Sequence, residues 1–461
     1  MTGGHRKRST TISHAVAFAL LIAAIVLVPF PLASNRPMVV GLLAIFLAGL
    51  LFFVVAADFL ADRAMRHRLR RGWPALLAFL MLLALMSVQR VDWGSGPISV
   101  DPHYTLLYML MTIAYACVFT LILLVVNDSG RLRILALALI ASGLLQAVIA
   151  ILLHSAQARY SLFFFDVDHG NYATGMFSYR NSLANYLLMC ICLGIGILMG
   201  SGATKDNTVF SLRELAAGLV RFSLSKAMLL RLVLVVMVIA LVLTRSRMGN
   251  AALIMVIVMV ALPMLFAMGR VRKRTLVLLA SFVVLDILIV GNLVGVEKVV
   301  DRIQQTPILQ QEPGSPASEE SLEARSSPGL QALSMVAERP LLGFGAGGFY
   351  AAFPRFALPQ HVLSYDHAHN DVLQIAAEMG LIGFALMAGL LMVSLYRALA
   401  VIKNPYSPLD RGLAFGVILA LIAALIHALV DFHLQIPANA LTFVVLLGLA
   451  WVIRPKTPEN S

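Results

Sequence analysis

Long runs of apolar residues constrain the fold of this chain more than any other feature. A helix needs about 20 apolar residues to cross the hydrocarbon core of a bilayer, and a helix satisfies its own backbone hydrogen bonds in lipid. The chain is 60% hydrophobic and only 13% charged, as a membrane protein would be. Runs of membrane length lie at 12–30, 38–57, 73–88, 104–126, 132–153, 182–200, 227–243, 250–268, 275–292, 371–396, 412–430 and 438–453. The sequence therefore predicts an all-α polytopic membrane protein of about 12 transmembrane helices.

The spacing of these runs divides the chain into three parts. Residues 1–292 would hold the first nine transmembrane helices, 293–370 a large loop, and 371–461 the last three helices and a tail. A loop this long is usually functional in a compact protein. The first run follows His5-Arg6-Lys7-Arg8 but is too long for the apolar core of a signal peptide, so we expect it to be a retained helix.

Basic residues fall mostly on one side of the predicted membrane. The N-terminus, the alternate loops and the C-terminus carry 24 of them, whereas the short loops on the other side carry only 6: Arg36, Arg90, Arg159, Arg180, Arg245 and Arg247. The positive-inside rule then places both termini in the cytoplasm and the large loop outside it. Because this topology explains most of the net charge of +12 through contact with anionic lipid headgroups, we expect no nucleic-acid partner.

Two features that suggest special chemistry fit structural roles better. The three cysteines, Cys117, Cys190 and Cys192, all lie inside apolar runs, which is typical of small buried side chains and not of a disulfide framework. The glycine-rich stretch from Gly343 to Gly348 lacks the Lys-Ser/Thr end of a nucleotide-binding loop. Tight turns and close packing explain these glycines instead.

Arginines on the outer side are the first candidate site residues. Arg245 and Arg247 end the seventh apolar run, against the charge bias, with almost no loop to hold them. They would either reach outer-leaflet headgroups or capture a lipid phosphate or diphosphate, which a guanidinium binds bidentately. Arg325 lies in the large loop, where an arginine is usually a solvated charge.

Histidines and acids at the mouths of two late helices are the second candidates. The segment from Asp366 to Asp371 carries His367 and His369, and this pattern permits a metal site, a general base that titrates near neutral pH, or a helix cap. We expect no metal there, because two histidines beside acids is a permissive pattern. Asp431-Phe432-His433 precedes the last helix and is expected to act as a cap and interfacial segment, with lining of the same cavity as the alternative.

An ordered set of motifs resembles the bacterial O-antigen ligase and O-antigen polymerase superfamily. His369-Asn370, nine further residues and Gly380-Leu381-Ile382-Gly383 resemble the superfamily's His-Asn-x9-Gly-x-x-Gly signature. Ser246-Arg247 with Gly249, and Arg325 ahead of the stretch 339–349, are similar to two further motifs and stand in the same order. The resemblance covers roughly residues 225–450, and the first half of the chain matches in hydropathy alone.

The resemblance implies a C-type glycosyltransferase of the bacterial inner membrane with its active site on the periplasmic side. The donor would be a glycan on undecaprenyl diphosphate, and the transfer would be inverting and independent of metals and cofactors. His369 would take the proton of the acceptor hydroxyl, a task that suits a histidine, while Arg247 and Arg325 would stabilise the diphosphate leaving group. We assign substrate binding to Arg245, Asn370, His367 and Arg180.

The acceptor and one other class of protein stay open. A ligase would transfer the glycan to lipid A–core, a polymerase would transfer it to another lipid-linked repeat unit, and a protein acceptor is a third option. A secondary transporter is the alternative from another class, since many have this number of helices. Transporters usually show repeated halves and ionisable groups at mid-membrane, whereas Asp286 is the one clear carboxylate near the middle of a late run of this chain.

Overall fold

The computed structural model of the chain describes residues 2–30, 32–59, 64–157, 160–161, 165–166, 172–200, 225–268, 279–281, 284, 322–357 and 365–456. These residues are helical apart from loops and one antiparallel pair of short strands, β1 (Tyr160–Ser161) and β2 (Phe165–Asp166). The predicted all-α class is thereby confirmed for the described part of the chain.

Nine helical stretches among the described residues are long and apolar enough to cross a membrane. They are α2 (Pro37–Phe59), α3 (Ala64–Arg90), α4 (Pro102–Val125), α5 (Ser129–Ser155), α6 (Arg180–Gly200), α8 (Lys226–Leu243), the run of α9 (Arg247–Val256), η2 (Ile257–Ala261) and α10 (Leu262–Ala267), α15 (Asp371–Lys403) and α16 (Pro408–Ala428). Two shorter apolar helices lie in α1 (Thr2–Leu27) and α17 (Pro437–Val452). The chain is therefore a multi-pass integral membrane protein, and the predicted run 275–292 lies largely outside the described residues.

Several of these helices begin at the capping residues that the sequence supplies. Asp101 accepts hydrogen bonds from the backbone of His103 and Tyr104 at the start of α4, and Pro102 stands in the first turn, where its missing N–H has no helical partner to lose. Asp128 caps α5 in the same way. Such caps satisfy backbone donors that would otherwise lack partners at a helix end.

Two helices are longer than the apolar runs that predicted them. The run 73–88 becomes α3, which begins at Ala64, and the run 371–396 becomes α15, which ends at Lys403. The added residues include the arginines of 66–71. Arginine has a high helix propensity, so the helix continues past the lipid-facing part that hydropathy detects.

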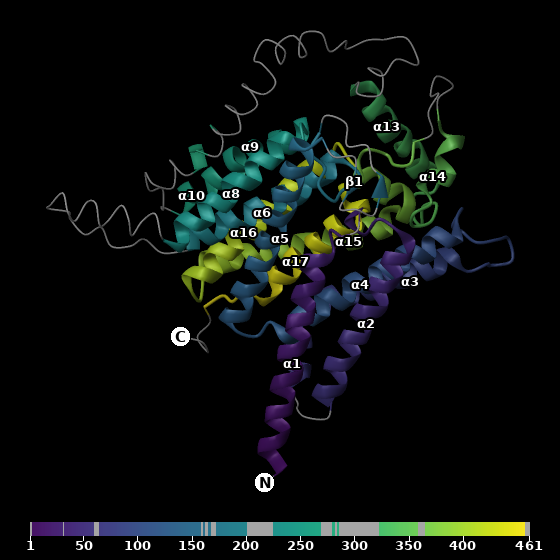
Figure 1. Cartoon of the computed structure of the whole chain (residues 1–461). Helices are drawn as coiled ribbons and strands as arrows, with labels where there is room; N and C mark the ends of the chain where they lie inside the picture. The colour runs from purple at the N-terminus through teal and green to yellow at the C-terminus, as the bar shows by residue number, and fades with distance from the viewer. Residues whose placement is uncertain are drawn as a thin grey trace. The chain divides into compact units, whose positions relative to one another are not determined.

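The described residues form two compact units. The first comprises residues 1–127, 291–394 and 425–451. Within it α1, α2, α3 and α4 pack side by side, as Figure 1 shows. In the same unit, an apolar core joins α13 (Leu322–Glu338), α14 (Phe349–Ala352) and η3 (Phe353–Arg355) to the beginning of α15. Its residues include Met335, Phe344, Phe349 and Ala377.

The second unit comprises residues 128–290, 395–424 and 452–461. Here α5, α6 and α8 pack against one another. The helices α6 and α16 approach so closely that a Cβ atom on Gly196 would overlap the backbone of Gly412 and Gly416. Small residues allow such close approach of transmembrane helices, which associate by packing because lipid gives no hydrophobic drive.

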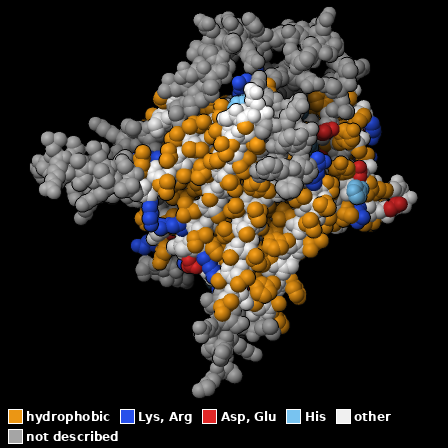
Figure 2. Space-filling view, viewed as in Figure 1, with side chains coloured by type: hydrophobic (Ala, Val, Ile, Leu, Met, Phe, Trp, Pro, Cys, Tyr) orange, Lys and Arg blue, Asp and Glu red, His pale blue; other side chains and the backbone are white. Residues whose placement is uncertain are grey.

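The surface of the helices is apolar, as a bilayer requires. Met38, Ile45 and Phe52 on α2 are between 72% and 75% exposed. Figure 2 shows hydrophobic side chains over most of the described surface in view, with Lys and Arg in small groups. A surface of this kind is stable in contact with lipid and would aggregate in water.

The helix α15 is broken at Gly380. This residue has φ 65° and ψ −178°, which no helix contains. The backbone groups that the break releases find partners in the segment 340–345: Leu381 N–H donates to Pro340, and Phe344 and Gly345 N–H donate to Ala377 and Glu378. The break therefore divides α15 into a short part that begins at Asp371 and a long membrane part, and these bonds to the segment 340–345 replace helical ones at the break.

Candidate active site

His369 lies in the loop 365–370 that leads into α15, and this loop is held from both sides. Asn370 caps α15 by accepting a hydrogen bond from Leu373 N–H at 3.0 Å, and its amide donates to the Leu429 carbonyl at 2.8 Å. Gln374, one turn into the helix, accepts from Ala368 N–H at 3.0 Å. His369 itself has φ 49°, an uncommon conformation for a residue with a side chain. Such strain persists only where the surrounding contacts impose it.

A buried carboxylate stands beside His369. The Oδ1 atom of Asp431 is 3.6 Å from His369 Nδ1, and the exposed fraction of the His369 side chain is 27% against 6% for Asp431. Phe432 N–H also donates to this oxygen at 3.0 Å. At 3.6 Å these two atoms are beyond hydrogen-bond distance, and the interaction is electrostatic. A nearby carboxylate still favours the tautomer with the proton on Nδ1, which leaves Nε2 as the basic nitrogen. The pair has the form of a histidine base with its orienting acid.

The charge on Asp431 is favoured by its neighbours. Burial acts to raise the pKa of Asp431, but His433, His369 and His427 outweigh it and hold this pKa below its ordinary value. The carboxylate is therefore ionised at neutral pH. An ionised partner stabilises the imidazolium that forms when His369 accepts a proton.

His367 is distinct from His369 although only one residue separates them. Its ring stacks on Phe432 at 4.3 Å between centroids, and its Nδ1 atom is 3.1 Å from Gln374 Nε2. Burial is the main cause that lowers the pKa of His367 to about 4. At neutral pH this ring is uncharged and accepts a hydrogen bond from the amide, so any contact with substrate would be a neutral one.

The segment that carries Asp431 is fastened to the start of α15. Asp371 is fully buried and accepts hydrogen bonds from Leu434 N–H at 2.8 Å and from Gln435 Nε2 at 3.0 Å. Gln435 in turn accepts from the Tyr108 hydroxyl on α4 at 2.8 Å. These bonds fix the distance between the loop of His369 and the loop of Asp431.

A second set of hydrogen bonds, centred on Glu378, supports the site. Glu378 is buried on α15 and accepts from Gly347 N–H and Phe349 N–H at 3.0 and 3.3 Å and from Gln374 at 3.0 Å. Gly345 and Gly347 have φ values of 101° and 72°, which suit glycine. The glycine-rich stretch thus forms tight turns around a buried carboxylate, as the sequence suggested.

One cluster in the described residues has the donor set of a metal site. It consists of His427, Asp431 and His433, all buried, whose ligand atoms lie within 4.8 Å of one another. The rings of His427 and His433 are 3.9 Å apart between centroids. Two imidazoles and a carboxylate suit Zn²⁺ or a similar ion. The cluster differs from the His367–His369 pair, whose pattern permits a metal site although none was expected there. Asp431 and His433 are buried, whereas the sequence favoured a cap and interfacial segment, with lining of the cavity as the alternative.

Three of the four candidate arginines, Arg180, Arg245 and Arg247, lie in the second unit. Ser246 caps α9 by accepting from Gly249 N–H at 3.2 Å, and this places Arg245 and Arg247 on either side of it, both exposed. Arg245 has φ 51° in the tight turn between α8 and α9. Arg180, at the start of α6, stacks over the Tyr172 ring at 3.7 Å.

These arginines share one end of the second unit. Ala173 N–H donates to the Leu243 carbonyl at 3.1 Å, so the segment with Tyr172 lies at the end of α8, next to the turn of Arg245. Arg325 lies on α13 in the first unit, and its side chain is outside the described part of the chain. The structure therefore brings His367, His369 and Asn370 together in one unit and the other three arginines in the other.

Gln374 and Glu378 are functional candidates that the sequence did not single out, whereas Asp431 was expected to act in a cap and interfacial segment, with lining of the same cavity as the alternative. A signal exists for Gln374 and Glu378, because a glutamine and a glutamate inside an apolar run are costly unless they have a structural or chemical task. The signal for Asp431 is weaker, since an acid before a helix is usually a cap.

Comparison with known proteins identifies one family that part of the chain matches. Residues 232–388 match the profile of a protein family described as O-antigen ligase. The matched range contains Arg245, Arg247, Arg325, His369 and Glu378. Curated proteins give no match to the chain. The chain thus carries a domain of the O-antigen ligase family across residues 232–388.

Proposed function

We propose that this protein is a membrane glycosyltransferase that moves a glycan from undecaprenyl diphosphate to an acceptor hydroxyl, as an O-antigen ligase with lipid A–core as acceptor. The observation that carries the proposal is the pair of His369 and Asp431, 3.6 Å apart, at the end of a membrane helix. His369 lies inside the matched range 232–388, and Asp431 lies beyond it. A histidine with an ionised carboxylate behind it is suited to remove a proton from a sugar hydroxyl.

The reaction is a single displacement at the anomeric carbon. The acceptor oxygen attacks C1 and its proton passes to His369 Nε2, while the C1–O bond to the diphosphate breaks and its electron pair stays on the diphosphate. Attack from the face opposite the leaving group inverts the anomeric configuration. Asp431 holds the imidazole in position and stabilises its positive charge.

Arginines take the place of a metal ion in this scheme. Negative charge develops on the diphosphate as the bond breaks, and Arg247 and Arg325 are the residues we assign to stabilise it. Guanidinium groups are permanently charged and match the geometry of phosphate oxygens. No metal ion is then needed at the reacting atoms.

The remaining site residues bind or orient substrate in this proposal. Arg245 and Arg180 would bind the diphosphate or the glycan. Asn370 orients the loop of His369 through its two backbone partners, and His367 offers a neutral ring beside Phe432.

The site would face the periplasm. This follows from the charge bias of the loops, which predicts that both termini are cytoplasmic and that the chain resides in the bacterial inner membrane. The donor is then a glycan already present on the outer leaflet, so no nucleotide sugar takes part.

The test uses purified protein in nanodiscs, supplied with undecaprenyl-diphosphate glycan with or without lipid A–core. We expect glycan on lipid A–core with the wild type and none with His369→Ala. His103→Ala is a matched control, because His103 is an exposed histidine of the same unit outside the site. Products are measured by gel mobility and mass spectrometry.

Each other outcome has a distinct meaning. A ladder of longer glycans from the donor alone would identify a polymerase, with a second lipid-linked repeat unit as acceptor. Full transfer by His369→Ala would refute the assignment of the base. Absence of glycan transfer with all donors, together with proton-coupled uptake that survives His369→Ala, would favour a transporter.

A further inference from the structure

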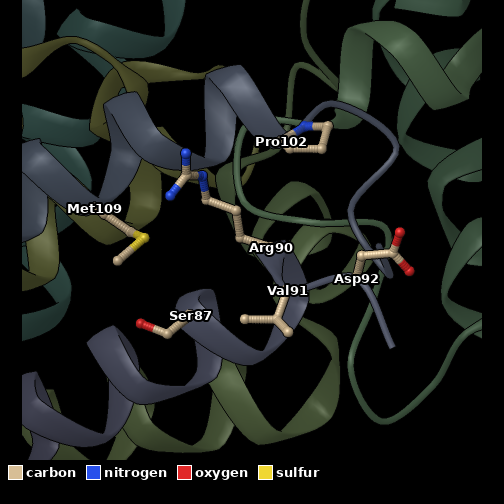
Figure 3. Close-up of a pocket in the computed structure, with 6 residues that line it drawn as sticks. All are labelled: Ser87, Arg90, Val91, Asp92, Pro102 and Met109. Atoms are coloured by element: carbon tan, nitrogen blue, oxygen red, sulfur yellow. The ribbon is translucent and has the colours of Figure 1, made fainter. Parts of the chain in front are cut away.

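A cavity of about 490 Å³ opens where α3 ends and α4 begins, and the proposed reaction makes no use of it. Its lining residues are Ser87, Arg90, Val91, Asp92, Pro102 and Met109 (Figure 3). The size is in the range of small-molecule sites. Because both helices are membrane spans, the cavity lies at the boundary between the apolar core and the polar surface.

The cavity is on the same side of the membrane as the candidate active site. Beyond the end of α3, Val100 N–H donates to the Phe344 carbonyl, and Gln89, the neighbour of Arg90, donates to the Glu378 carbonyl at 3.0 Å. These contacts join this end of α3 and α4 to the glycine-rich stretch and to α15. The cavity would therefore face the outer leaflet in the orientation proposed above.

Arg90 gives the cavity a positive charge. It is the one lysine or arginine in the lining, and no acidic side chain among the described residues forms an ion pair with it. Asp92 is held in its own turn, where its Oδ1 atom accepts from Gly94 and Gly96 N–H at 2.8 and 2.9 Å. In Figure 3 the Arg90 side chain extends toward the Met109 side of the cavity, and the Asp92 carboxylate points the other way.

An apolar stripe leads away from the cavity along α3. Trp73, Leu77 and Leu80 on this stripe are 58%, 43% and 63% exposed. Successive spacings of four, three and seven residues place these three side chains on the same helix face as Ser87, which lines the cavity. The stripe therefore lies on the face of α3 that also lines the cavity, and this face contacts lipid.

Two exposed aromatic residues stand close in sequence to the lining of the cavity. Trp93 and Tyr104 are 62% and 49% exposed, and each is close in sequence to a lining residue, Asp92 or Pro102. Aromatic side chains of this kind prefer the headgroup level of a bilayer. The cavity is thus placed at the depth of lipid headgroups.

We propose that this cavity binds the phosphate headgroup of a membrane lipid, with Arg90 on the phosphate and the lipid chain along Leu80, Leu77 and Trp73. A guanidinium forms charge-assisted hydrogen bonds with phosphate oxygens. The apolar stripe accepts the chain of the same molecule, which a free anion would not need. This site is separate from the glycan transfer proposed above and does not depend on it.

The test measures lipid binding without turnover. Detergent-purified protein is titrated with phosphatidylglycerol, and native mass spectrometry gives the affinity for the first bound lipid. Loss of a hydrogen bond to a charged group should weaken this affinity by about 10- to 100-fold in Arg90→Ala. Arg36→Ala, which removes an exposed arginine of the same unit outside the cavity, should leave it unchanged.

A second variant tests the cavity and not the charge. Ser87→Trp fills the space from an exposed position of α3 and keeps Arg90, so it should weaken lipid binding too. Equal affinities in wild type, Arg90→Ala and Ser87→Trp would overturn the proposal. Displacement of the bound lipid by excess inorganic phosphate would also overturn it, because the site would then recognise free phosphate and not a lipid.

Discussion

Replacement of Asp431 by asparagine would test the pairing with His369 most directly. The two side chains have similar volume, so the variant removes a charge and keeps the packing. With opposite charges 3.6 Å apart, the attraction between the imidazolium and the carboxylate is about 5 kcal/mol at an effective dielectric constant of about 20. Partial exposure of His369 allows water to screen the pair, and we take about 2–3 kcal/mol as the part that remains.

That energy affects the rate of transfer, because the imidazolium forms as the acceptor proton leaves. A loss of about 2–3 kcal/mol corresponds to a fall in kcat of about 30- to 150-fold. KM for the donor should change little, since Asp431 is buried behind the histidine. The assay is single-turnover transfer from undecaprenyl-diphosphate glycan in nanodiscs, with saturating donor.

Asp366→Asn is the matched control for this experiment. Asp366 is an exposed acid in the same loop as His369, so its removal changes the local charge without touching the pair. A wild-type rate is expected for it. A kcat for Asp431→Asn within about 3-fold of wild type would refute the reasoning, since that corresponds to less than about 1 kcal/mol.

Three further predictions concern other parts of the molecule. A Cβ atom on Gly380 would overlap the Leu341 carbonyl at φ 65°, so Gly380→Ala should lower the thermal midpoint in detergent sharply, whereas Gly389→Ala, in open space on the same helix, should leave it equal or slightly higher. The pKa of His367 is lowered to about 4 in the folded state, whereas a histidine in the unfolded state has a pKa near 6.5. Between these two pH values the unfolded state binds a proton that the folded state does not bind. Stability should therefore rise with pH from about 4 to 6.5, by at most about 3 kcal/mol, and His367→Gln should remove this slope in denaturant titrations; an unchanged slope would contradict burial of His367 as its cause. Arg247→Lys keeps the charge but loses the planar fork, and initial-rate assays should show transfer about 10-fold slower; a rate equal to wild type would mean that a point charge suffices.

Hydropathy predicted the membrane helices well because lipid imposes a simple rule. Every predicted run other than 275–292 lies on a described helix, and the three cysteines are buried and unpaired with one another. The helix ends were predicted less well, since α3 extends through charged residues that the apolar pattern excludes.

The polar interior could not be predicted residue by residue. Gln89, Glu378 and Asp431 find their partners on segments that are distant in the sequence, and no local pattern encodes such pairs. The sequence shows Asp431 only as an acid before a helix, which is typical of a cap. The fold shows that it lies beside His369. The role of the His-Asn motif stays a prediction, because it depends on a family resemblance and not on spacing alone.

The break in α15 limits how the length of this chain can vary. Segment 340–345 supplies hydrogen-bond partners on both sides of Gly380: Pro340 and Leu341 pair with Leu381 and Ile382, and Phe344 and Gly345 pair with Ala377 and Glu378. Insertion of a single residue into the helix would rotate the two parts of α15 relative to each other by about 100° about the helix axis and turn the short part away from its partners. We therefore expect these two stretches to be intolerant of insertions and deletions, and changes in chain length to accumulate outside them.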